Sequence, residues 1–224
     1  MGTAIYTSGS DFSAIANSFF PPVADPLAWG NFESSALSDS RRLRNFGRYG
    51  GSFSLSGIAK LVAKGIAAEA GTQSLLTLGT FTPDAYTLIA LVDVGTMAPI
   101  MRHRNIRIYT GDSKKLIRIM DGGTAITEIT APSAGAFVVF LSGDLTGHDF
   151  GIVTSTGVQK ATYTAVASGS IATSIGGNNS AGTPVAWAAY SSAFYDRKLS
   201  DTQLMQVAGI MIKRALALGV NVNG

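Results

Sequence analysis

The C-terminal segment places one amphipathic helix directly after a strand-like run, and this order restricts the fold more than any other feature. Residues 185–195 form a strand-like run of aromatic, aliphatic and small side chains, and a helix is predicted from Ser200 to about Leu218. Ser200 as N-cap with Gln203 three positions later is a capping-box pattern, and Gly219 is a natural helix end. The helix has one apolar stripe, made by Leu204, Val207, Met211, Ala215 and Leu218. A helix with one apolar stripe is expected to pack on a sheet.

The remainder of the chain has the pattern of short strands separated by turns. The clearest hairpin joins residues 116–120 to 124–129 through Asp121-Gly122-Gly123, because Asp-Gly supplies the positive φ angles of a tight primed turn. Residues 58–70 fit helical spacing as well as a strand. Strands are expected near residues 52–56, 74–81, 86–94, 105–110, 115–120, 125–129, 136–142, 150–153, 158–166, 171–176 and 185–195. We therefore predict an all-β fold, a two-sheet antiparallel sandwich with one C-terminal amphipathic helix.

The chain is expected to form one structural domain. Its 224 residues suit a single β-sandwich, since sandwiches of this size form single domains. Residues 1–50 are irregular, with large apolar side chains between prolines and glycines, and are predicted to form an arm and first strands that pack on the body. Residues 51–224 are predicted to form the sandwich with its helix at about residues 200–218.

Composition excludes several classes of protein. There is no cysteine, so neither disulfides nor thiolate metal sites are possible. A net charge of +3 is too weak to indicate nucleic-acid binding. The first residues lack the basic and apolar regions of a secretory signal, and no apolar run reaches the roughly 18 residues of a membrane helix. We expect a soluble protein that is made in a cytosol and does not insert into a membrane.

The low content of charged residues, 14%, indicates a homo-oligomer in which another subunit covers part of the surface. Abundant small polar Ser, Thr and Gly would produce the same composition in a monomer. Both interpretations remain open from composition alone.

Two phrases in the C-terminal third resemble the concanavalin A-like (laminin G-like) jelly-roll family. One is Ser-Ile-Gly-Gly-Asn-Asn at 174–179, where a strand reaches a glycine turn. The other is Tyr-Asp-Arg-Lys-Leu-Ser-Asp at 195–201, where a later strand leads into a helix. The resemblance implies a jelly-roll arrangement of the two sheets. The calcium site of laminin G domains is not reproduced, so calcium binding is not implied.

More narrowly, the layout resembles tail-associated virion proteins of tailed bacteriophages. The matching stretches are 11–14, the Pro-Pro-Val at 21–23, Trp29, Arg44-Asn45, Phe81-Thr82 and 86–90. The resemblance implies a virion component of the phage tail tip or fibre that contacts other tail proteins and recognises a host-surface glycan. Phage fibres commonly have threefold symmetry, so the implied oligomer is a trimer.

A saccharide site needs an aromatic face for the sugar's C–H surface and amide or carboxylate groups for its hydroxyls. Trp187 and Tyr195, with Asn178 and Asn179 in a nearby turn, are the candidate residues. Strand alternation places Trp187 and Tyr195 on one face and Tyr190 on the other, so at least one set must belong to the core. Burial of Trp187 in the core or an interface competes with its use as a ligand platform.

The basic residues concentrate in one region of the sequence, which makes it a second candidate site. They are Arg102, Arg104 and Arg107, followed by Lys114, Lys115 and Arg118 on the next strand. Such a cluster can hold an anionic glycan or a phosphate. A solvated strand face, or ion pairs across subunits, would give the same pattern.

No metal site, cofactor site or catalytic motif is predicted. His103 and His148 are far apart and lack ligand spacing, and Asp144 with Asp149 offers too few carboxylates for a calcium shell. The glutamates form no glycosidase-type motif, and no nucleophile elbow is present. We expect a protein that is not an enzyme. The competing hypotheses are an architectural tail or capsid decoration protein and, less favoured, a polysaccharide depolymerase.

Overall fold

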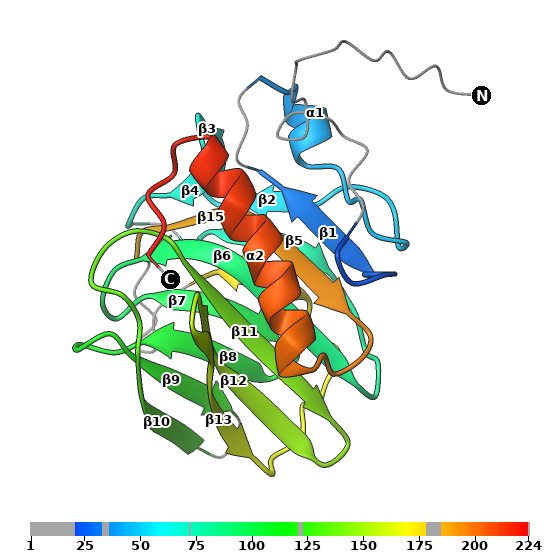
Figure 1. The fold of residues 1–224 in the computed structure, drawn as a ribbon, viewed down its shortest axis with the longest axis vertical. Coiled ribbons are helices and arrows are strands. Elements are labelled where there is room, and N and C mark those ends of the chain that lie inside the picture. Colours follow the sequence, from blue (N-terminus) through cyan, green and yellow to red (C-terminus); the bar gives the residue numbers. More distant parts are fainter. Residues whose placement is uncertain (1–20, 33–35, 72, 121–122, 178–184, 224) are drawn as a thin grey trace.

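The computed structural model describes residues 21–32, 36–71, 73–120, 123–177 and 185–223. Their strands form two stacked sheets in which the paired strands run antiparallel, and one long helix lies on the outer face of one sheet (Figure 1). The predicted two-sheet antiparallel sandwich with one C-terminal helix is therefore confirmed.

One sheet contains eight strands and the other seven. The eight-stranded sheet runs in the order β13 (Gly157–Tyr163), β12 (Gly147–Thr154), β11 (Phe137–Asp144), β6 (Tyr86–Val94), β15 (Trp187–Tyr195), β4 (Gly65–Ala68) and β3 (Lys60–Val62), with β1 (Ala28–Asn31) also paired to β15. The seven-stranded sheet runs in the order β10 (Gly123–Thr130), β9 (Lys115–Met120), β8 (Ile106–Thr110), β7 (Pro99–His103), β14 (Thr173–Gly176), β5 (Leu75–Gly79) and β2 (Ser54–Ser56). The helices are α1 (Asp39–Arg42) and α2 (Asp201–Ala217).

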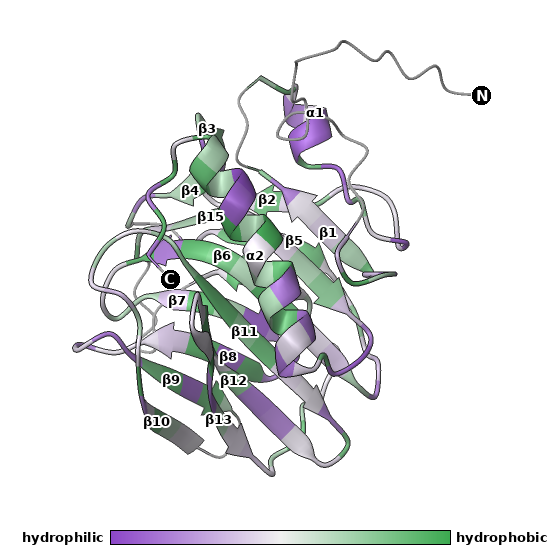
Figure 2. Cartoon of the chain, in the orientation of Figure 1, coloured by the Kyte–Doolittle hydropathy of each residue, from purple (hydrophilic) through white to green (hydrophobic). Residues whose placement is uncertain are grey.

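The eight-stranded sheet is covered on both faces, and this explains the composition of its central strands. β6 and β11 are apolar along nearly their whole length and are buried on both sides. One face of these strands packs against the seven-stranded sheet, and the other packs against α2. Figure 2 shows the resulting apolar colour on β6 and β11 behind the helix. A strand with two buried faces needs a continuous apolar run rather than an alternating one.

Helix α2 has the ends and the buried stripe that its sequence predicts. The Ser200 side chain accepts a hydrogen bond from Gln203 N, and the Gln203 side chain accepts one from Ser200 N, which completes the capping box. Gly219 follows the helix with a φ of 73°. The predicted stripe residues Leu204, Val207, Met211 and Ala215 are buried, and Leu218 is half-buried as the C-cap. Burial of this stripe on the sheet stabilises the fold through the hydrophobic effect.

A β-bulge in β15 changes which side chains enter the core. The register with β6 shifts between Ala189 and Ser191, so the simple alternation stops there. Trp187 therefore packs between the two sheets, whereas Tyr195 packs on the opposite face, under α2. The prediction that Trp187 and Tyr195 share one face was wrong, because one extra residue reverses the alternation beyond the bulge.

Several local elements differ from the sequence-based expectation. Residues 58–70, which fitted either a helix or a strand, contain β3 and β4 and pair as a hairpin. β7 was not predicted, and β1 was expected only as one of the first strands in residues 1–50, without bounds. β1 contains Gly30 and Asn31, which have low strand propensity, and pairing with β15 forms the strand nonetheless. In β7 a register shift between Pro99 and Met101 interrupts the alternation that marks a strand.

Arg42 joins the N-terminal part of the described chain to the β3–β4 hairpin. Its guanidinium is almost fully buried and donates hydrogen bonds to the carbonyls of Phe32, Val62 and Gly65. Three carbonyl acceptors compensate the loss of water around this buried cation. Among the described residues, no helix has both the length and the apolarity needed to cross a membrane.

Candidate functional site

The outer face of the seven-stranded sheet carries a row of polar side chains from four adjacent strands. Thr77 of β5 pairs with Ser174 of β14, Ser174 pairs with Arg102 of β7, and Arg102 pairs with Arg107 of β8. We call these four residues the polar row. Directly paired residues on one face lie within about 4.5–5.5 Å at their Cβ atoms, so the row is continuous across the strands.

An apolar row lies beside the polar row on the same face. It comprises Leu75 of β5, Pro99 of β7 and Tyr109 of β8. Leu75 and Tyr109 each lie two positions along their strand from a member of the polar row, and Pro99 lies beside the register shift in β7. The row continues outward through Ile117 and Ile126, which pair across β9 and β10. The Ile126 side chain at the outer end of the row is 65% exposed, whereas Tyr109 is buried, with 3% of its surface exposed.

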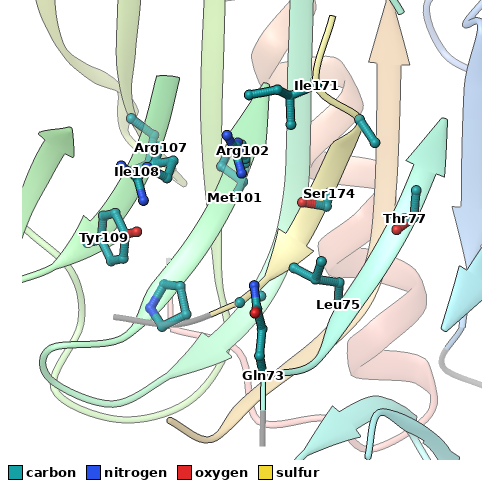
Figure 3. A pocket seen from close by; sticks show the side chains of 14 residues that line it. Gln73, Leu75, Thr77, Met101, Arg102, Arg107, Ile108, Tyr109, Ile171 and Ser174 are labelled. Atoms are coloured by element: carbon teal, nitrogen blue, oxygen red, sulfur yellow. The ribbon is translucent and has the colours of Figure 1, made fainter. Parts of the chain in front are cut away.

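The two rows line a single groove. Its cavity volume is about 260 Å³, and the strands β5, β14, β7 and β8 provide most of its lining. Figure 3 shows Thr77, Ser174, Arg102 and Arg107 around the hollow, with Leu75 on the same strand as Thr77. Gln73, just before β5, adds an amide to the lining. The groove thus offers hydroxyl, amide and guanidinium groups next to an apolar surface.

The structure separates the six basic residues that the sequence grouped together. Arg102 and Arg107 line the groove, but Arg104 lies in the β7–β8 turn and donates from Nε to Gly169 O at 2.8 Å. Lys114 donates from Nζ to the carbonyls of Val94, Pro132 and Ser133, so it joins loops. The prediction of one basic surface made by all six residues was wrong, because they occupy different faces and turns.

The other two basic residues are also engaged elsewhere. Lys115 forms an ion pair with Glu128 at 2.5 Å on the β9–β10 hairpin. Arg118 points between the sheets, where its guanidinium carbon lies 4.8 Å from the ring centroid of Tyr163. Adjacent residues on a strand point to opposite faces, so a run of basic residues in a sequence does not make one surface.

The predicted aromatic platform is not available at the surface of this chain. Trp187 is 3% exposed, and its Nε1 donates to Ser74 O at 3.1 Å inside the core. Tyr195 is fully buried, its hydroxyl donates to Val23 O, and burial raises the pKa of the phenol. Neither ring can present a face to a sugar. Asn178 and Asn179 lie outside the described residues.

The two histidines are interior residues rather than surface ligands. The His103 ring shares a hydrogen bond of 2.9 Å with Thr173 Oγ1 and packs 4.2 Å from the ring centroid of Tyr86. Burial lowers the pKa of His103 to about 3, with a smaller contribution from Arg104. Burial also lowers the pKa of His148. Within the described ranges, no cluster of histidine and acidic side chains is arranged to hold a metal ion.

Asp144 and Asp149, weighed as calcium ligands, are turn and ion-pair residues. Asp144 accepts hydrogen bonds from the backbone and side chain of Thr146, which lower the pKa of its carboxyl. Asp149 forms an ion pair with Lys198 at 3.0 Å. A lysine within this distance disfavours a second cation at the same carboxylate.

Five of the groove residues were not predicted as site residues from the sequence. Leu75, Thr77, Pro99 and Tyr109 belong to no motif or charge cluster. Ser174 begins the glycine-turn phrase at 174–179, which gave it no role in a site. Alternation along β5 and β8 indicates that Leu75 and Thr77 share a face, and that Arg107 and Tyr109 share a face. The missing information is that β14 lies between β5 and β7. Its residue Ser174 pairs with Thr77 and Arg102, which lie far from it in the sequence.

No protein-family model matches the sequence, and no curated protein sequence matches it either. Solved structures do match the fold. A mutant of Trypanosoma rangeli sialidase that displays trans-sialidase activity superposes with a TM-score of 0.57 at 14% identity, over 86% of this chain and 34% of the sialidase chain. The chain thus spans about a third of that protein.

Binding domains of botulinum neurotoxins match the fold to the same degree. The binding domain of neurotoxin DC, solved in complex with SialylT, has a TM-score of 0.59 at 8% identity, over 82% of this chain and 50% of that chain. The serotype C1 binding domain has a TM-score of 0.57 at 8% identity, over 84% of this chain and 52% of that chain. At such identities the likeness shows a shared fold.

Proposed function

We propose that this protein is a non-enzymatic saccharide-binding module and that its site is the groove on the outer face of the seven-stranded sheet. The observation that carries the proposal is the position of the polar row beside the apolar row. A sugar ring has the same division, because its C–H surface is apolar and its hydroxyls lie at the edge. Ligand sites typically combine an apolar lining with a few convergent polar groups.

The structural neighbours support the saccharide class. A neighbouring toxin domain was solved in complex with SialylT, and a neighbouring Trypanosoma rangeli sialidase was solved in complex with sialic acid. These ligands belong to those proteins, and the shared fold alone does not transfer them. Together with the groove, they favour a saccharide over other small molecules.

The setting that we propose for the module is the tail tip or fibre of a bacteriophage, where it would contact other tail proteins. The sequence phrases at 21–23, 44–45, 81–82 and 86–90 support this proposal. We further propose a homotrimer, since several copies would turn weak sugar contacts into firm attachment. Light scattering after gel filtration measures the mass directly, and a monomer at micromolar concentration contradicts the oligomer.

The groove is tested by a pair of matched threonine substitutions. Thr77→Val removes a hydroxyl from the groove, whereas Thr124→Val removes one from β10 on the same sheet, outside the groove lining. Both changes keep a β-branched side chain, so the strands should persist. We expect Thr77→Val to weaken the binding of an array-identified glycan about fivefold, as one lost hydrogen bond predicts, and Thr124→Val to leave it unchanged.

Two outcomes would favour other functions. If the wild-type protein binds no glycan on a broad array, the saccharide proposal fails and an architectural role in the tail or capsid is favoured. If incubation with a bound polysaccharide releases new reducing ends, the protein is a depolymerase and the non-enzymatic part of the proposal fails.

A further inference from the structure

We infer that the groove selects saccharides that carry an oxyanion, and that Arg107 is the residue that binds the anionic group. The inference rests on the proposed saccharide function and assigns the ligand its charge. Three observations support the inference: the positive charge of the groove lining, the buried Arg107 Nε without a hydrogen-bond partner, and the apolar row beside the two arginines.

The lining of the groove is cationic. Of its 14 described lining residues, Arg102 and Arg107 carry positive charge, and none is an aspartate or a glutamate. A concave site lined by charges of one sign attracts ligands of the opposite sign. The net charge of the chain, +3, acts in the same direction.

One donor of the Arg107 guanidinium is unsatisfied. Its Nε is buried and has no hydrogen-bond partner within the described ranges. The ion pairs among the described residues use other cations, namely Arg48, Lys60, Lys115, Lys160 and Lys198. A buried charged donor without a partner is unfavourable, so a ligand that supplies an acceptor gains the compensation that the chain does not.

Arg102 provides a second cation at a fixed position. It pairs directly with Arg107 across β7 and β8, and both side chains are half-buried. Its Nε donates to Arg104 O at 2.9 Å, which orients the guanidinium. Like charges directly opposite each other on two strands are unfavourable. An anion bound between them removes this repulsion, because it attracts both groups.

The apolar row indicates an organic anion rather than a bare inorganic ion. Leu75, Pro99 and Tyr109 line the same cavity as the two arginines. An inorganic ion would leave this surface without a partner, whereas a sugar acid covers it with its C–H face. The planar guanidinium fork matches a carboxylate by two parallel hydrogen bonds and also binds sulfate or phosphate. The shared chemistry is therefore a sugar-borne oxyanion.

The test compares acidic saccharides with their neutral counterparts. The probes are oligogalacturonate against its carboxyl-reduced form, sialyllactose against lactose, and dextran sulfate against dextran, measured by titration calorimetry. We expect the wild-type protein to bind at least one carboxylate probe at least tenfold more tightly than its neutral counterpart. Preference for dextran sulfate alone would assign a sulfate ester as the oxyanion and would still support the inference.

The residue is tested by two arginine substitutions with the same charge loss. Arg107→Gln should abolish the acidic preference, while Arg104→Gln, in the turn of the same hairpin and outside the groove lining, should retain it. Arg107→Lys keeps the charge but not the planar fork, and we expect it to retain less than half of the preference. Melting temperatures of the variants verify that the fold persists.

Four results would overturn the inference. Equal loss in Arg107→Gln and Arg104→Gln would indicate general charge attraction, and an unchanged preference in Arg107→Gln would remove the assigned residue. Equal affinity of the wild type for acidic and neutral sugars, still sensitive to Thr77→Val, would leave the saccharide function standing and overturn only its anionic character. Absence of binding to every probe and array glycan would overturn both.

Discussion

The indole of Trp187 lies directly against Gly176, and no side chain fits between them. A Cβ atom built on Gly176 would fall 2.2 Å from Cε2 of Trp187, far inside van der Waals contact. Gly176 also has a φ of +83° and lines the groove. The glycine therefore separates the buried indole from the groove, and Trp187 supports the groove from the core side.

We predict that Gly176→Ala destabilises the protein more than Gly169→Ala. Both glycines have a left-handed φ, +83° and +79°, but a Cβ on Gly169 meets no atom within 4 Å. Gly169→Ala should cost about 1–2 kcal/mol from backbone strain alone. Gly176→Ala should cost about 1–3 kcal/mol more through the clash with Trp187. Urea denaturation of both variants measures the difference, and equal losses would show that the indole moves aside freely.

We predict that Trp187→Ala reduces the free energy of unfolding by about 3–5 kcal/mol, as large core truncations do. Trp187 is 3% exposed and lies among core residues of both sheets. Trp187→Phe keeps an aromatic ring but loses the hydrogen bond to Ser74 O, so its loss should be smaller. Thermal and urea denaturation measure both. Full stability of Trp187→Ala would contradict the core placement.

We predict that the free energy of unfolding decreases as the pH falls below about 6.5. In the folded protein the pKa of His103 is lowered from 6.5 to about 3, chiefly by burial, so the folded state stays neutral where the unfolded state binds a proton. The contribution of neutral His103 to the free energy of unfolding is complete above pH 6.5, the pKa in the unfolded state. It is lost as the pH falls toward 3, at about 1.4 kcal/mol per pH unit. The lowered pKa of His148 acts with the same sign.

The variant His103→Phe isolates the contribution of this histidine. Phenylalanine keeps the aromatic packing against Tyr86 and Phe194 but cannot titrate. Urea denaturation at pH 7 and pH 5 should show a smaller pH dependence in the variant than in the wild type. An identical pH dependence would indicate that His103 does not titrate differently in the two states.

We predict that Ser200→Ala lowers the free energy of unfolding by about 1 kcal/mol, the usual value of an N-cap. Ser200 Oγ accepts from Gln203 N, and Gln203 Oε1 accepts from Ser200 N. Thr202→Ala is the control, because this exposed residue lies in the same turn of α2 without serving as the cap. Equal stability of the two variants in thermal denaturation would argue against the capping box.

Local sequence patterns were sufficient for elements whose cause is local. The capping box at Ser200 and the apolar stripe of α2 depend on residues within one or two helical turns, so the helix could be predicted with its ends. The strand predicted at 86–94 matches β6, because its apolar run is continuous. β9 and β10 pair with each other as the predicted hairpin requires, while Asp121 and Gly122 of its turn lie outside the described residues.

Patterns that depend on pairing partners were not visible in the sequence. The bulge in β15 depends on how Ala189 and Ser191 meet β6, and it moves Trp187 and Tyr195 to opposite faces. The basic cluster was separated because β7, β8 and β9 each present alternate residues to opposite sides. Composition and spacing carry no information about which strands pair or in which register they meet.

The sequence by itself determined the two-sheet sandwich, most of its strands and the terminal helix, because hydrophobic periodicity and capping act over short distances along the chain. Only the tertiary structure decided the candidate site. The polar row requires Thr77, Arg102 and Ser174 to lie side by side, and the order β5-β14-β7 brings them together from distant parts of the chain. That order results from packing of the whole sheet, which no local pattern encodes.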